Sequence, residues 1–194
     1  MVIVKECYSD CIDIIRNVIE RSMGWFHAYY ASACIDIGRC GGVVALDRDV
    51  VGVGVFYKVD LKPYAIGVIY YVAVDERYRG KGIGKMIVSS IEELLDSDSL
   101  GYYVASTRSG NIGSRKMFQD LGYIEVYLDD LDSDLYEAVL QAVCAYEDDI
   151  LSIKTVRNSI EYLYKMLRDE NNLKIVRDVW RVQCYGLWRK LRGA

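Results

Sequence analysis

One junction in the sequence restricts the fold more than any other feature. An apolar run at residues 66–74 is followed by three alternating glycines, Gly80, Gly82 and Gly84, and then by a helix-like stretch at 83–95. A strand that turns into a helix through such glycines leaves backbone N–H groups unpaired at the positive end of the helix dipole. Such a turn binds phosphate. The sequence therefore predicts an anion site at this junction.

The elements around this junction predict an α+β fold. Apolar residues recur at helical spacing in some stretches, and short β-branched runs separate those stretches. The resulting order is β-α-α-β-β-β-α-β-α-β, which favours a mixed, mostly antiparallel central sheet flanked by helices. The predicted strands are 2–6, 43–46, 50–57, 66–75, 102–106 and 123–127, and the predicted helices begin near Ser9 and cover about 25–37, 83–95 and 112–121.

Residues from Leu131 onward show helical periodicity. Such stripes of apolar residues usually face a core. The end of the chain fits two descriptions: we favour a last strand at about 182–191, although Val176, Val179, Trp180 and Leu187 also fit a helix. For 194 residues we expect a single domain, residues 1–194, with a core at about 1–130, a helical elaboration at about 131–172 and the closing strand. The two stripes are Leu135, Val139, Ala142, Val143 and Tyr146, and Val156, Ile160, Leu163 and Leu167.

Composition argues against several classes of protein. Apolar residues make up 52% and charged residues 27%, as in globular proteins, and no apolar run approaches the roughly 20 residues of a membrane-spanning helix. The N-terminus lacks a basic region followed by a long apolar core, so we expect a cytoplasmic protein. The net charge of −4 argues against nucleic acid as a partner, and only a basic segment at 154–194 speaks for it.

The six cysteines and the single histidine, His27, bear on metals and redox state. No Cys-x-x-Cys pair is present, so we expect no Cys/His zinc site. We expect the cysteines to be small, reduced hydrophobic side chains. The alternative is an intracellular disulfide of the kind found in hyperthermophiles. The cysteines are Cys7, Cys11, Cys34, Cys40, Cys144 and Cys184.

Two common phosphate loops do not fit the glycine junction. A Walker loop requires glycine where Arg79 stands and Ser or Thr where Met86 stands. A dinucleotide fingerprint requires Gly-x-Gly-x-x-Gly inside a parallel unit, whereas these glycines alternate and the preceding elements are predicted to be antiparallel. A different kind of phosphate loop is therefore needed.

The pattern Arg-x-x-Gly-x-Gly at Arg79, Gly82 and Gly84 resembles the acyl-CoA loop of the GNAT superfamily of N-acetyltransferases. A second segment, 111–123, resembles the next motif of that superfamily, in which an Asn opens a helix that ends in Gly and an aromatic residue. The resemblance covers about residues 1–130, and 187–191 is similar to the strand that often closes these domains. It implies the GNAT fold, acetyl-CoA as co-substrate, no metal, and an amine-bearing protein, peptide or small molecule as acceptor.

The resemblance also implies which residues hold CoA. The glycines let the backbone approach a pyrophosphate, and Arg79 and Lys81 add positive charge. Strand residues would offer backbone groups to the pantetheine arm, and Asn111 would hydrogen-bond that arm from its other side. The implied CoA-binding residues are Val72, Ala73, Val74, Arg79, Gly80, Lys81, Gly82, Ile83, Gly84, Lys85 and Asn111.

The groups that would move protons depart from the family pattern. Acetyl transfer needs a neutral amine to attack and a proton for the departing thiolate. Many relatives place a Tyr acid where this chain has Phe118, and others place a catalytic Glu where it has Ser106 or Val68. Two readings remain open: an active enzyme, or an acyl-CoA-binding module that has lost turnover and uses its C-terminal helices for association, for example as a homo-oligomer.

Four residues are candidate substitutes for the missing catalytic groups. Tyr70 and Tyr71 flank the expected thioester, Tyr123 follows the second motif, and His27 lies between two predicted helices that often border the acceptor site in this family. Packing is the other explanation for each tyrosine. Catalysis could also rest on proximity and on polarisation of the carbonyl by a strand N–H.

Overall fold

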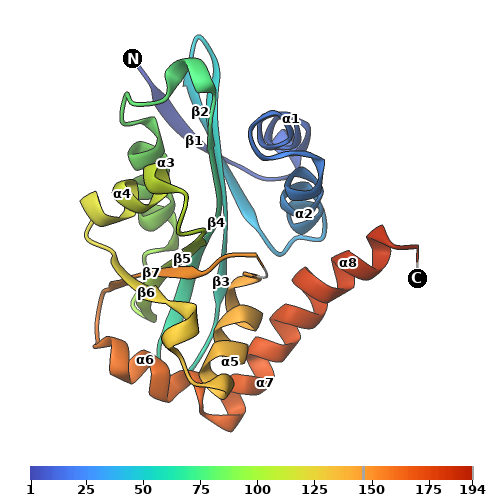
Figure 1. Cartoon of the computed structure of the whole chain (residues 1–194). Coiled ribbons are helices and arrows are strands. Elements are labelled where there is room, and N and C mark those ends of the chain that lie inside the picture. Colours follow the sequence, from blue (N-terminus) through green and yellow to red (C-terminus); the bar gives the residue numbers. More distant parts are fainter. Residues whose placement is uncertain (146, 194) are drawn as a thin grey trace. The chain divides into compact units, whose positions relative to one another are not determined.

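The computed structural model describes residues 1–145 and 147–193 and has the predicted α+β architecture (Figure 1). In the described part of the chain, seven strands form one sheet in the order β1-β2-β3-β4-β5-β7-β6. Strands β4 and β5 are parallel, and the pairs β1–β2, β2–β3, β5–β7 and β6–β7 are antiparallel. The strands are β1 (Ile3–Cys7), β2 (Gly41–Asp47), β3 (Asp49–Val59), β4 (Ala65–Val74), β5 (Leu100–Thr107), β6 (Ile124–Tyr127) and β7 (Ile150–Thr155).

Helices and short turns connect these strands. No helix within the described residues is long and apolar enough to cross a membrane. A π-helix at Trp180–Tyr185 and the 3-10 turns η1 (Ser9–Cys11), η2 (Glu76–Tyr78) and η3 (Leu128–Asp130) complete the chain. The α-helices are α1 (Ile12–Met23), α2 (Trp25–Asp36), α3 (Ile83–Leu95), α4 (Ile112–Asp120), α5 (Ser133–Val143), α6 (Ile160–Leu167), α7 (Glu170–Val179) and α8 (Gly186–Leu191).

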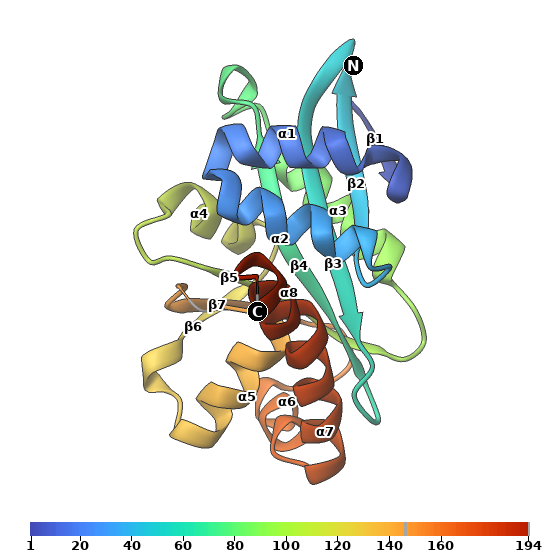
Figure 2. The ribbon, with the colours of Figure 1, turned by 90° about the vertical axis from the view of Figure 1, so that its right-hand side faces the viewer.

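The chain divides into two compact units. The first comprises Met1–Tyr57 and Ile69–Leu95, and the second comprises Lys58–Val68 and the chain from Asp96 onward. Helices α1 and α2 cover one face of the strands in the first unit, and α3 covers the opposite face (Figures 1 and 2). The glycine junction between β4 and α3 belongs to this first unit.

Glycines on β2 and β3 explain how closely the helices of the first unit approach the sheet. A Cβ added at Gly54 would lie 2.6 Å from Cγ2 of Ile87 in α3. On the opposite face, a Cβ at Gly42 would lie 2.5 Å from Cδ1 of Ile15 in α1. Both distances are shorter than real Cβ contacts, so a side chain at either position would force the facing isoleucine to shift. In the Val-Gly-Val-Gly-Val run of β3, the valines therefore lie on one face of the sheet, and Gly52 and Gly54 on the other face leave room for α3.

The predicted hairpin at 47–49 is confirmed. Asp47 pairs with Asp49 across the turn, and Arg48 between them adopts φ +64°. A positive φ is uncommon for a residue other than glycine and occurs mostly in tight turns.

The second unit corrects the predicted helical elaboration at about 131–172, because part of this segment is a strand. Ile150–Thr155 form β7, which lies between β5 and β6 in the sheet. Ile150, Leu151 and Ile153 are almost fully buried, because a central strand is covered on both faces. Such a strand lacks the alternation that would distinguish it from a short helical segment.

The predicted closing strand at 182–191 is wrong, because this segment is the π-helix followed by α8. Its buried residues are Gln183, Cys184 and Leu187, which with Val176 of α7 recur at helical rather than alternating spacing. The competing helical pattern was therefore the correct one. Tyr146, the last member of the first predicted stripe, lies outside the described residues.

The expectation of reduced cysteines is also wrong. The structure contains the disulfides Cys7–Cys11, Cys34–Cys40 and Cys144–Cys184. The first two close short loops in the first unit, with sequence separations of 4 and 6. The third has a separation of 40 and ties the end of α5 to the π-helix in the second unit.

Candidate functional site

The glycine junction forms an open loop between η2 and α3. Gly80 and Gly82 have φ +75° and +78°, a region that glycine enters without penalty and other residues avoid. A Cβ built at either position would meet nothing within 4 Å, so this side of the loop is open. Gly84 differs, since it lies in the first turn of α3 and is not among the residues with positive φ.

Helix α3 begins directly after this loop. The Met86 N–H donates to the Gly82 carbonyl at 3.1 Å, which is the first helical hydrogen bond. The N–H groups of Ile83 and Gly84 precede it and therefore have no acceptor within the helix. Ile83 is only 2% exposed, which anchors this first turn in the core. An exposed loop with two left-handed glycines thus leads into the N-terminus of a 13-residue helix, where the helix dipole favours anions.

An ion pair holds the turn before the loop. Asp75 accepts hydrogen bonds at 3.1 Å from the Arg77 backbone N–H and from its guanidinium Nε and Nη2. These bonds to Arg77 lower the pKa of Asp75 to about 2. Arg79 Nε donates to the Val74 carbonyl at 3.2 Å, so the end of β4 is bound by the side chain of the motif arginine. Lys81 lies over the Tyr78 ring, with Nζ 4.8 Å from its centroid.

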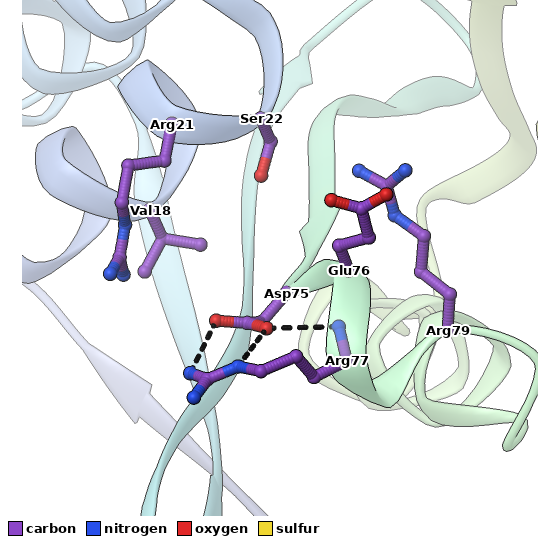
Figure 3. Close-up of a pocket in the computed structure, with 7 residues that line it drawn as sticks. All are labelled: Val18, Arg21, Ser22, Asp75, Glu76, Arg77 and Arg79. Carbon is purple, nitrogen blue, oxygen red and sulfur yellow. Dashed lines mark hydrogen bonds and ion pairs between the residues drawn. The ribbon is translucent and has the colours of Figure 1, made fainter.

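A pocket of about 290 Å³ lies beside this turn (Figure 3). It is lined by Val18, Arg21 and Ser22 of α1 and by residues of the turn between β4 and the loop. Three guanidinium groups and two carboxylates line it, and the Asp75–Arg77 pair accounts for one of each. The pocket therefore has a small excess of positive charge next to the glycine loop.

Strand β4 supplies the backbone groups that precede the loop. Ala73 is buried and lies close to Gly52 of β3: a Cβ added at Gly52 would be 3.0 Å from the Ala73 carbonyl oxygen. The Asp75 N–H donates to the Val51 carbonyl at 2.9 Å. Val72, Ala73 and Val74 are therefore held against β3 and run directly into the turn. The turn at 75–78 links them to the loop at 79–85, within the first unit.

Three of the four candidate catalytic residues form a cluster in the same unit. The ring centroids of Tyr70 and Tyr71 are 4.3 Å apart, although successive side chains of a regular strand point to opposite faces. Strand β4 therefore departs from a regular pleat here. Tyr57 of β3 contacts Tyr70 at 5.4 Å, and His27 of α2 contacts Tyr71 at 5.8 Å, between ring centroids.

Asn111 and Tyr123 belong to the second unit. Asn111 is the N-cap of α4, and its Oδ1 accepts from the Ser114 N–H at 3.2 Å, which accounts for an Asn at the start of this helix. Tyr123 is 4% exposed and packs on Phe118 with ring centroids 5.0 Å apart. Lys154 Nζ lies 5.7 Å from the Tyr123 centroid. These contacts favour packing over catalysis for Tyr123.

Ser106 has a partner that the sequence did not predict. Its hydroxyl donates to Asp148 Oδ2 at 2.6 Å, and the neighbouring Asp149 accepts from the hydroxyl of Ser109 at 2.5 Å. A carboxylate therefore reaches the end of β5 from the segment before β7. The only signal in the sequence was the acidic run at 147–149, which cannot be paired with residue 106 until β7 is known to lie beside β5. Among the residues that the structure describes, no group of three or more His, Cys, Asp or Glu side chains could hold a metal ion.

A family model decides the identity. The model described as Acetyltransferase (GNAT) family matches residues 8–123, which is more than half of the chain and includes both motifs. The chain belongs to the GNAT acetyltransferase family. No curated protein sequence matches this GNAT chain significantly.

Solved structures agree with the GNAT fold. NAA60 from Arabidopsis thaliana in complex with a bisubstrate analogue is 12% identical, with a TM-score of 0.61 over 82% of this chain and 100% of that one. The IAA acetyltransferase from Bacillus cereus is 19% identical, with a TM-score of 0.56 over 80% and 100%. The ribosomal-protein-S18-alanine N-acetyltransferase from Escherichia coli is 13% identical, with a TM-score of 0.58 over 83% and 97%. At these identities the likeness is one of fold.

Proposed function

We propose that this GNAT protein is an N-acetyltransferase that moves an acetyl group from acetyl-CoA to a primary amine of a protein, peptide or small molecule. The observation that carries the proposal is the loop at 79–84. Two glycines with positive φ leave its backbone open, and the N-terminus of α3 follows at once. Both features suit a pyrophosphate, because exposed backbone N–H groups and the positive end of a helix dipole bind anions.

The proposed CoA contacts are those that the resemblance implies for the end of β4 and the loop. The N–H groups from Gly80 to Lys85 would donate to the pyrophosphate oxygens, and the exposed side chains of Arg79 and Lys81 would add positive charge. Backbone groups of Val72, Ala73 and Val74 would bind the pantetheine arm, since an extended chain can pair with a strand as another strand does. Asn111 is assigned to that arm as well, by resemblance to the family.

The chemistry itself is simple to balance. The neutral amine attacks the thioester carbonyl, the C–N bond forms as the C–S bond breaks, one proton leaves the amine and one reaches the CoA thiolate. A strand N–H that hydrogen-bonds the carbonyl oxygen would stabilise the negative charge that develops there. Tyr70 and Tyr71 directly precede Val72, and His27 contacts Tyr71, so these three residues are the candidates for proton transfer.

A second function, acyl-CoA binding without turnover, is favoured by the residues at the usual catalytic positions. Phe118 is buried and has no proton to donate, and Val68 is buried in β4. Ser106 is bonded to Asp148. Such a module would use bound CoA for regulation or association, including as a homo-oligomer through its C-terminal helices.

Binding and turnover are separated by one experiment. The purified chain is titrated with CoA by calorimetry and then incubated with acetyl-CoA and a mixture of peptide and small-molecule amines, with products detected by mass spectrometry. An acetylated amine together with micromolar or tighter CoA binding supports the enzyme. CoA binding without any acetylated product supports the inactive module, and no CoA binding refutes both.

A further inference from the structure

The last helical segment of the second unit carries a row of planar side chains. Helix α7, the π-helix and α8 follow one another without a break and form one helical ribbon (Figure 1). The rings of Trp180 and Tyr185 stack with centroids 4.9 Å apart and 13° between their planes, and those of Tyr185 and Trp188 stack at 5.7 Å and 19°. The Arg192 guanidinium lies 5.3 Å from the Trp188 centroid. We name these four residues the stacked row.

The π-helix brings the first two rings of the stacked row together. In a π-turn the hydrogen bond joins residues five positions apart, and Trp180 and Tyr185 have this separation. The Gly186 N–H donates to the Arg181 carbonyl in the same way, and a Cβ added at Gly186 would lie 2.7 Å from that carbonyl oxygen. Glycine therefore permits the wider turn here. Such turns are rare and occur frequently at functional sites.

The opposite side of the segment anchors it in the second unit. Cys184 and Leu187 are almost fully buried, and Cys184 forms the disulfide with Cys144. Tyr185 and Trp188 are each 39% exposed. The rings are therefore fixed from behind and face solvent in front, so a ligand that contacts them has little ordering entropy to overcome.

Cations surround the stacked row. Residues 173–193 contain six basic residues and a single acidic one, Asp178, in a chain of net charge −4. Asp178 is paired with Arg181 at 2.7 Å. The surface thus suits an anionic partner, whereas a second copy of the same surface would bring cations against cations. The six basic residues, all exposed, are Lys174, Arg177, Arg181, Arg189, Lys190 and Arg192.

The order of rings and cations decides between anionic partners. Arg181, Tyr185, Trp188 and Arg192 follow at spacings of four, three and four residues, so they share one side of the helical segment. A helix that lies in a membrane surface instead separates its cations from its apolar face. A single-stranded polynucleotide alternates phosphates with planar bases, and its protein sites combine cations along the backbone with aromatic rings on which the bases stack.

We propose that the stacked row and its cations bind a single-stranded polynucleotide. Bases stack on Tyr185 and Trp188, while Arg192 and the neighbouring basic side chains bind phosphates. The net charge of the whole chain, which argues against nucleic acid, conceals this local excess of positive charge. The proposal concerns a second binding surface and does not depend on acetyl transfer.

Labelled oligonucleotides test the proposal on the full chain. Fluorescence anisotropy is measured with oligouridylate and oligothymidylate of about 15 nucleotides, and with a duplex of the same length, from about 50 to 200 mM salt. We expect micromolar binding of a single strand, with a slope of log K against log salt of about −2 for about three bound phosphates. The two single strands distinguish RNA from DNA as the source. The duplex should bind more weakly, because its bases are stacked inside.

Other anions provide the results that would overturn the proposal. They are a polyglutamate peptide and vesicles of phosphatidylcholine with about one-fifth phosphatidylserine. Binding to the vesicles without binding to either single strand would identify a membrane surface instead. Equal affinity for polyglutamate or for the duplex would show that the surface attracts anions without contacting bases. Binding of none of these probes would refute the proposal and leave CoA binding unaffected.

Single substitutions then locate the surface. Tyr185→Ala and Trp188→Ala should each weaken binding of the single strand about tenfold, and Trp188→Phe, which keeps a ring, should retain most of the affinity. Arg192→Gln should reduce the magnitude of the salt slope by about 0.7. Trp25→Ala is the matched control, since Trp25 is an exposed tryptophan of the first unit, and it should change nothing. Unchanged affinity in both ring variants, with thermal unfolding showing them folded, would refute the assignment to the stacked row.

Discussion

The conformation of Gly82 allows CoA binding to be separated from stability. At φ +78° an L-residue is strained by about 1 to 2 kcal/mol, partly offset because alanine reduces the entropy of the unfolded chain by about 0.4 to 1 kcal/mol. A Cβ at this position meets no atom within 4 Å, so no steric term is added. Gly82→Ala should therefore lower the free energy of unfolding by only about 1 kcal/mol.

The same Gly82→Ala substitution should weaken CoA binding by more than it lowers stability. The new methyl group projects from the face on which a pyrophosphate would contact the loop backbone, so we expect at least about tenfold weaker CoA binding, or about 1.4 kcal/mol. Gly82→Glu adds a negative charge, and two unit charges 4 Å apart at an effective dielectric constant of 20 repel by about 4 kcal/mol. Because solvent screens this exposed loop, that value is an upper bound, but measurable binding should be lost.

Gly38 provides a matched control. It is exposed, has φ +68°, and an added Cβ there also meets nothing within 4 Å. Gly38→Ala should therefore cost the same stability in thermal unfolding as Gly82→Ala and leave the calorimetric Kd for CoA unchanged. Wild-type affinity in Gly82→Glu would show that the loop is not the CoA site. Equal loss of affinity in both alanine variants would show that binding responds only to general destabilisation.

Two further predictions concern stability and ionisation. Asn172 is 2% exposed, and its amide accepts from the Lys62 N–H at 2.8 Å and donates to the carbonyls of Lys62 at 2.8 Å and Met166 at 3.0 Å. Asn172→Ala should therefore lower the free energy of unfolding, measured in urea, by about 2 to 4 kcal/mol. A loss no larger than that caused by Asn171→Ala, at an exposed neighbour, would contradict this reasoning. Arg77 lowers the pKa of Asp75 to about 2 in the folded state, below its usual value. The stabilisation from the Asp75–Arg77 pair is therefore complete above about pH 4 and is lost as the pH falls towards 2. An NMR titration of the Asp75 carboxyl should show its pKa return towards 3.8 in Arg77→Met, and an unchanged pKa would refute Arg77 as the cause of the shift.

The features that the sequence predicted correctly are those fixed by neighbouring residues. The hairpin at 47–49 and the start of α3 depend on conformations within a few residues, such as the positive φ of Arg48 and Gly82, and the strand before the glycine loop is marked by an uninterrupted apolar run at 66–74. Local composition was sufficient in each case. The CoA-binding assignments at 72–85 are of the same kind and stay predictions until CoA is bound.

Two of the features that the sequence missed, the Cys144–Cys184 disulfide and the carboxylate beside Ser106, depend on distant partners. The Cys144–Cys184 disulfide spans 40 residues, and nothing near either cysteine distinguishes a paired thiol from a buried reduced one. Ser106 meets Asp148 only because β7 pairs with β5, with Ser106 opposite Leu151. Pairing between strands follows from the whole sheet, so no local pattern could have supplied this carboxylate.

The residues after 130 are part of the sheet rather than an addition to it. Strand β7 is antiparallel to both β5 and β6, from Thr155 opposite Tyr102 to Ile150 opposite Tyr127, so β5 and β6 have no direct pairing with each other. A chain that ended near residue 130 would leave β6, four residues long, without its neighbour and would expose an apolar edge of β5, which promotes aggregation. The end of β5 carries Ser106 and leads to Asn111, so β7 is needed to hold the second GNAT motif in place.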